Sequence, residues 1–90
     1  MRVQIEVMVS FLGAAECVAI YSKIIEMPFA PTKEVTLYIH EKVNEDSAFE
    51  IDILSYDHPS QILTVTCFDN DAFPDYEDRY REAGFERQDG

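Results

Sequence analysis

The first ten positions after the initial methionine alternate between polar and apolar side chains. Val3, Ile5, Val7 and Val9 fall on one side of an extended chain, and Phe11 continues that side. A period of two with β-branched residues is typical of a strand that buries one face. The pattern therefore predicts a β-strand over residues 2–11 with its apolar side toward the core.

The next apolar positions recur at the spacing of a helix. They are Ala14, Cys17, Val18, Tyr21, Ile24 and Ile25. Steps of three and four put these side chains on one face and leave Glu16, Lys23 and Glu26 for water. Pro28 ends the pattern, because proline lacks a backbone N–H and restricts the residue before it. This stretch predicts a long amphipathic helix.

Period-two alternation returns in the second half of the chain. It predicts strands over residues 34–41, 49–56 and 62–68, separated by a polar turn at 42–47 and a hairpin connection at 57–60. The last strand is ambiguous, because apolar side chains lie on both of its faces. Either face could point to the core.

A short helix is expected near the C-terminus. It runs from about Asp75 to Ala83, with Pro74 before it and Gly84 as its C-cap, and residues 85–90 form a frayed tail. The fold class is then α+β, one domain over residues 1–90 in the order β-α-β-β-β-α. Its mostly antiparallel four-stranded sheet carries one long helix on one face.

Charge changes the picture of what the domain could bind. The 90 residues carry a net charge of −11, and residues 69–90 alone hold eight acidic residues against three arginines. Such a field repels nucleic acid and anionic membrane as direct partners and suits a basic protein. No apolar run reaches the length of a membrane span, so a cytoplasmic location is expected. Cys17 and Cys67 are expected to be reduced and packed in the core, and no cofactor is predicted.

The stretch DNDAFPDYED, from Asp69 to Asp78, has three interpretations. As a calcium loop it fails, because Pro74 and Tyr80 stand where an EF-hand needs glycine and glutamate. As a helix start it is satisfactory, since carboxylates favour the positive end of a helix dipole. As a partner surface it would also use its aromatic side chains, which interfaces enrich as anchors.

The leading hypothesis is a non-enzymatic acidic module that docks on a basic, nucleic-acid-handling protein and inhibits it. Carboxylates along a helix and a sheet edge would imitate a row of phosphates. The predicted partner-binding residues are Asp69, Asp71, Phe73, Asp75, Tyr76, Glu77, Asp78 and Tyr80, with Glu50 and Asp52 on the third strand.

The alternative is a small ligand-binding or catalytic domain. Its site would lie on the sheet near Tyr38, His40, Asp52 and Tyr56, where a histidine among carboxylates could act as a base or a metal ligand. His58, before a proline in a turn, has no such setting. A homodimer is a further option, since a second copy could cover the other face of the fourth strand.

The stretch AAECVAIYSKIIEMPF, after a first strand, resembles the helix that opens a glyoxalase-type βαβββ module. The resemblance implies a dimeric α+β ligand-binding domain. Met27-Pro28 replaces the glycine usual after that helix, and the family's metal ligands have no counterpart on the strands, so no metal site or activity is carried over. In size and acidity the chain is similar to phage inhibitors of restriction and CRISPR systems, and to bacterial immunity proteins.

Overall fold

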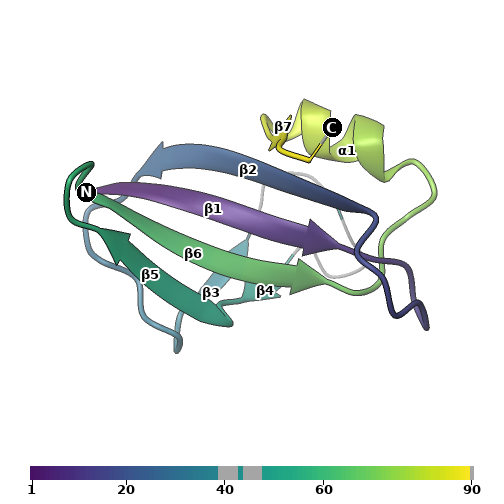
Figure 1. Cartoon of the computed structure of the whole chain (residues 1–90), viewed down its shortest axis with the longest axis horizontal. Helices are drawn as coiled ribbons and strands as arrows, with labels where there is room; N and C mark the ends of the chain where they lie inside the picture. The colour runs from purple at the N-terminus through teal and green to yellow at the C-terminus, as the bar shows by residue number, and fades with distance from the viewer. Residues whose placement is uncertain (39–42, 44–47, 90) are drawn as a thin grey trace.

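The first and last period-two segments form two long strands of one sheet. A computed structural model describes residues 1–38, 43 and 48–89 of the chain. Its larger sheet has the order β5-β6-β1-β2-β7 (Figure 1). The strands are β1 (Arg2–Val9), β2 (Ala19–Glu26), β5 (Ile53–Asp57), β6 (Ile62–Asp69) and β7 (Glu86–Arg87). A second sheet pairs β3 (Thr36–Tyr38) with β4 (Ala48–Glu50), and the helix α1 spans Tyr76–Glu82.

The larger sheet is mixed and five-stranded, so the prediction of one mostly antiparallel four-stranded sheet in a β-α-β-β-β-α order is wrong. β1 pairs antiparallel with β2 on one side and parallel with β6 on the other, while β5–β6 and β2–β7 are antiparallel. Figure 1 shows β3 and β4 behind this sheet, with α1 and β7 beside one half of β2. The result is a small compact α+β domain. Among the described residues, no helix has the length and apolarity needed to cross a membrane.

The prediction of a long helix over residues 14–26 is wrong. Residues 19–26 form β2, which pairs with β1 over its whole length, from Arg2 opposite Glu26 to Val9 opposite Ala19. The helical spacing misled because the segment is rich in isoleucine and tyrosine, which favour strands. The turn before β2 uses Gly13, whose φ of +78° suits glycine. Cys17, expected in the core, is exposed in this turn region.

The later predictions meet mixed outcomes. The strand expected over residues 34–41 is represented by the three-residue β3, and residues 39–42 and 44–47 lie outside the described residues. The strand expected over residues 49–56 is divided into β4 and β5. The hairpin that joins β5 to β6 is confirmed, as are β6 itself and the short helix. Where a frayed tail was expected, Phe85 is buried and β7 pairs with Tyr21 and Ser22.

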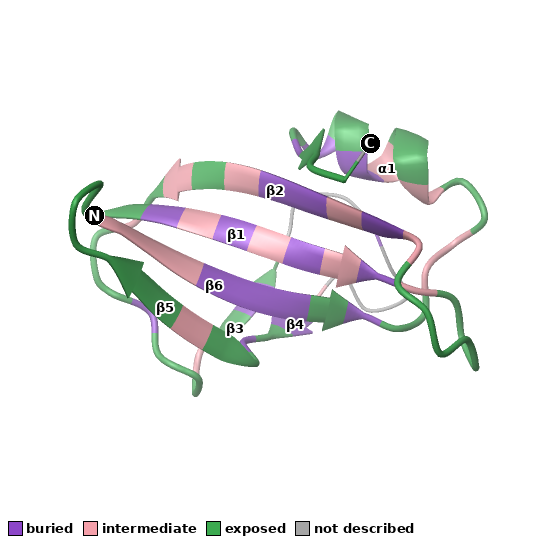
Figure 2. Cartoon of the chain, viewed as in Figure 1, coloured by how far each residue is buried: buried purple, intermediate pink, exposed green. Residues whose placement is uncertain are grey.

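The core lies on one face of the larger sheet, and Figure 2 shows the resulting alternation of buried and less buried residues along β1. The odd-numbered residues of β1 point into it, and the registers place the odd-numbered residues of β2 and β6 on the same side. Val65 and Cys67 are fully buried, so they settle which face of β6 is inward. Leu37 and Phe49 of the small sheet close the core from behind, and Tyr80 and Phe85 close it at the β2 end.

Candidate docking face of the sheet

The acidic segment begins with a buried carboxylate. Asp69 is the last residue of β6 and only 1% exposed, and its Oδ2 accepts a hydrogen bond of 2.7 Å from the Tyr80 hydroxyl. Its Oδ1 accepts the N–H of Asp71 at 3.2 Å. The Tyr80 ring stacks on Tyr21 at 4.8 Å and meets Phe85 edge-on. Asp69 and Tyr80, both predicted to contact a partner, instead fasten α1 to the sheet.

The other aromatic residues of the segment also serve the fold. Tyr76 is half-buried and makes edge-on contacts with the rings of Phe11 and Tyr21. Phe73 lies under the guanidinium of Arg79, whose carbon is 4.0 Å from the ring centre. Aromatic contacts and cation–π contacts of this kind stabilise packing without any ligand.

Three acids at the start of α1 are matched by arginines of the same chain. Asp75 pairs with Arg79 at 2.8 Å, Asp78 with Arg81 at 3.3 Å, and Glu77 with Arg87 at 2.8 Å. The hydrogen bond from Arg79 lowers the pKa of Asp75 below its ordinary value. Exposed pairs contribute only about 0–1 kcal/mol each, but they reduce the charge that this helix offers to a partner.

Glu50 and Asp52, unlike the three acids at the start of α1, have no arginine partner among the described residues. Both are exposed, and they line an open hollow of about 420 Å³ together with Phe68 and Asn70. Among the described residues, no ion pair engages either carboxylate. Thr36, Ala48 and Phe49 of the small sheet complete its lining, so this hollow lies at the edge where the small sheet meets the end of β6.

The outward face of the larger sheet has no element packed on it in the described part of the chain. We call it the open face: the even-numbered residues of β1, β2 and β6 and the odd-numbered residues of β5. One row across the strands is apolar, because Met8 lies opposite Ile20 on one side and opposite Phe68 on the other. Phe68 is 39% exposed, and Met8 and Ile20 are half-buried. Ile24 and Ile53 add exposed apolar surface.

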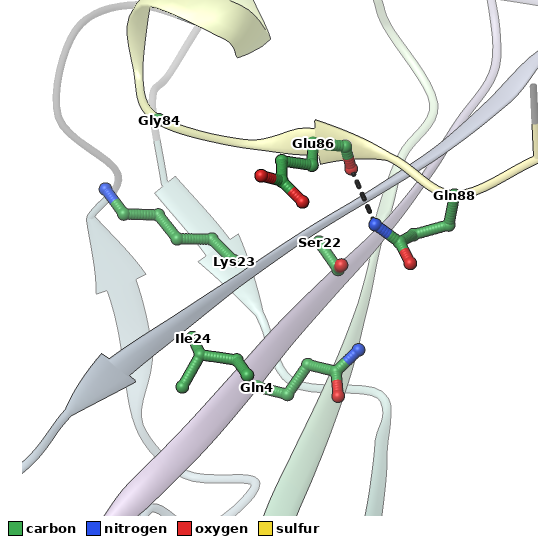
Figure 3. A pocket seen from close by; sticks show the side chains of 7 residues that line it. All are labelled: Gln4, Ser22, Lys23, Ile24, Gly84, Glu86 and Gln88. Carbon is green, nitrogen blue, oxygen red and sulfur yellow. Dashed lines mark hydrogen bonds between the residues drawn. The ribbon is translucent and has the colours of Figure 1, made fainter.

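A second hollow, of about 550 Å³, lies where the open face meets the edge formed by β2 and β7 (Figure 3). Its lining residues come from three strands and the end of the helix: Gln4, Ser22, Lys23, Ile24, Gly84, Glu86 and Gln88. Lys23 is already engaged, since its Nζ donates to the carbonyl oxygen of Ala83 at 2.7 Å. Glu86 is exposed, and its carboxylate has no partner among the described residues.

The alternative site is not assembled by the described residues. Tyr38 belongs to the small sheet and Tyr56 to the larger one, and His40 lies outside the described residues. His58 contacts only the ring of Tyr56 among the described aromatic residues, edge-on at 6.4 Å. In the described ranges, no group of three or more His, Cys, Asp or Glu side chains could hold a metal ion.

The apolar row is the part of the site that sequence reasoning missed. Its signal was present, because Phe68 and Ile62 gave the last strand a second apolar face and Met8 interrupted the polar face of the first. What the sequence does not show is that β6 lies parallel to β1, which brings Phe68 beside Met8.

The chain matches no family model, no curated protein and no solved structure. The resemblance to a glyoxalase-type module depended on a helix over AAECVAIYSKIIEMPF, and the second half of that stretch is β2. A functional assignment therefore depends on the geometry and charge of this molecule alone.

Proposed function

We propose that this protein is a non-enzymatic acidic binding module that docks through its open face on a basic surface of another protein. The observation that carries the proposal is the apolar row of Met8, Ile20 and Phe68, which no described element covers. Acids lie near the row: Glu50 and Asp52 line a hollow together with Phe68, and Glu86 stands opposite Ser22, two residues along β2 from Ile20.

The size of the face supports this use. Strands rise about 3.3 Å per residue and lie about 4.8 Å apart, so β1, β2 and β6, with eight residues each, and β5, with five, present roughly 400–500 Å². A standard interface takes about 800 Å² from each partner. The open face supplies about half of that area, and the two hollows at its ends extend it.

The chemistry supports a basic partner. An apolar centre with a charged rim is the usual anatomy of an interface, and opposite charges speed association and select the partner. The net charge of −11 attracts a basic surface. Because nucleic-acid-handling proteins present basic surfaces to phosphates, occupation of such a surface by this chain would inhibit its target.

The test is affinity capture from a lysate with three immobilised proteins: the wild type, Phe68→Lys and Leu12→Lys. Both variants replace an exposed apolar residue by lysine, but Leu12 lies in the loop between β1 and β2, outside the open face. A basic protein that elutes from the immobilised wild type between low and moderate salt should also be captured by Leu12→Lys. Phe68→Lys should not capture it. Retention of the same protein by both variants would contradict the proposal, as would capture of no basic protein by the wild type.

A further inference from the structure

Strand β2 is much longer than the strand that pairs with its outer edge. β2 spans Ala19–Glu26, whereas β7 pairs only with Tyr21 and Ser22, and the N–H of Gln88 adds one bond to the Ile20 carbonyl. Just before β7 begins, the chain bends at Gly84, which has a φ of +90°, so the residues that precede it lie along α1 and do not continue the line of β7. Figure 1 shows β7 and α1 over one half of β2, with the other half uncovered.

The backbone groups on the uncovered half point outward. Met1 and Met27 exchange both of their backbone hydrogen bonds, at 2.8 and 2.9 Å. In an antiparallel pair, bonded and non-bonded positions alternate, so Ile25 and Lys23 bond to β1, while Ile24 and Glu26 direct their N–H and C=O to the other side. Ile20 is an even-numbered residue of β2 like Ile24 and Glu26, and its carbonyl accepts the Gln88 N–H on the same outer edge, which agrees with this pattern. No described residue pairs with Ile24 or Glu26 there.

We propose that this edge receives an extended, basic segment of the partner protein as an added strand. The segment would pair with Ile24 and Glu26 along the line that β7 follows. Strand addition takes its affinity from main-chain hydrogen bonds and its specificity from the alternate side chains. The inference rests on the proposed function and names the part of the partner that reaches the β2 end of the open face.

The hollow beside the edge explains why the added strand should be basic. A side chain opposite Ile24 would point to the open face, two residues along the strand direction from Glu86, which β7 places opposite Ser22. Figure 3 shows Ile24 and Glu86 lining the same hollow from neighbouring strands. A lysine or arginine opposite Ile24 could therefore reach the Glu86 carboxylate, and Gln4 and Gln88 offer further acceptors.

A second copy of the chain fits this edge less well. Pairing two β2 strands would bring the Glu26 and Glu86 carboxylates of both copies into one region, and each chain carries a net charge of −11. Like charges at close range oppose such an association.

The probe for this edge is a short blocked peptide of alternating lysine and valine, added to the full chain at increasing concentration. The readout is amide hydrogen exchange by NMR, with the same peptide methylated on alternate backbone nitrogens as control. The exchange of Ile24 and Glu26 should slow about tenfold when about nine-tenths of the sites are occupied, because an amide then exchanges mainly from the unbound fraction. The methylated peptide should give no slowing.

A protein variant tests the same contact from the other side. In Ile24→Pro only an outward N–H is lost, which edge strands tolerate, and slow exchange of the β1–β2 amides would verify the fold. Ile24→Ala keeps the N–H and should still bind the peptide through its backbone. Ile24→Pro should lose the protection at Glu26.

The outcomes separate this inference from the proposed function. Peptide-induced shifts at Met8, Ile20 and Phe68 with no slowing at Ile24 would overturn the strand addition and leave the docking face in place. Absence of any effect on the whole open face would overturn both. Slowing that depends on protein concentration without peptide would assign the edge to a second copy and overturn the basic segment.

Discussion

The hydrogen bond between Tyr80 and Asp69 fixes the acidic segment to the sheet, and Tyr80→Phe removes it with the least other change. The substitution keeps the ring that stacks on Tyr21 at 4.8 Å and meets Phe85. It deletes only the hydroxyl that donates to the Asp69 carboxylate at 2.7 Å. Both side chains are buried, so water cannot readily take the place of the lost donor.

The expected cost follows from the kind of bond. A hydrogen bond to a charged group contributes about 1.5–3 kcal/mol, and its loss at a buried carboxylate falls within that range. For a domain of this size, 1 kcal/mol shifts Tm by about 4–8 °C. We therefore expect Tyr80→Phe to lower the free energy of unfolding by about 2 kcal/mol and Tm by roughly 8–16 °C.

The assay is urea unfolding followed by circular dichroism, with Tyr76→Phe as the matched control. Tyr76 is a half-buried tyrosine on the same helix, and no hydrogen bond of its hydroxyl is present among the described residues. Its variant should stay within about 0.5 kcal/mol of the wild type. Equal stabilities of Tyr80→Phe and Tyr76→Phe would refute the view that the buried bond holds the segment in place.

Three further predictions concern the cysteines, one glycine and pH. Iodoacetamide on the native protein should alkylate Cys17, which is exposed, and spare Cys67, where burial and the nearby Asp52 carboxylate raise the pKa of the thiol to about 12; double labelling in intact mass spectra would count against this. Gly84→Ala should cost about 1–2 kcal/mol in urea unfolding, because φ is +90° and the new Cβ would lie 3.1 Å from Nζ of Lys23, and unchanged stability would show that the turn is not strained. Stability should fall as pH rises above about 9, because the unfolded chain loses the Cys67 proton at a lower pH than the folded chain does. The Tyr80 proton adds to this loss of stability above about pH 10 for the same reason. A Tm that stays constant from pH 8 to 11 would contradict the prediction.

The fold was predictable where one period dominates and unpredictable where spacing and residue type disagree. β1 alternates over its whole length apart from Met8, and the proline-containing connection at 57–60 marks the hairpin that leads into β6. Residues 19–26 combine a helical spacing with residue types that favour strands. They form a strand because β1 pairs with them along the whole length of β2. Pairing between distant strands is a tertiary effect that local patterns do not contain.

The site shows the same division. Glu50 and Asp52 were nominated from charge alone, and the structure leaves both exposed beside Phe68. Asp69 was nominated too, yet it is buried. Its position was readable, since it continues the inward series of Val65 and Cys67 by one more step. An aspartate beside Asn70 and Asp71 suggests a solvated loop, and the sequence does not show that the Tyr80 hydroxyl and the Asp71 N–H donate to its buried carboxylate.

The central claim is that binding uses the acids beside the open face and not those of the helix. The most direct measurement is the salt dependence of Kd for the captured partner with two charge variants and the wild type. One variant is Glu50→Gln with Asp52→Asn, and the other is Asp75→Asn with Glu77→Gln and Asp78→Asn. We predict weaker binding and a shallower salt dependence for the first, and values near the wild type for the second, whose acids are already paired with arginines. The reverse order would return the docking surface to the helix and contradict the account.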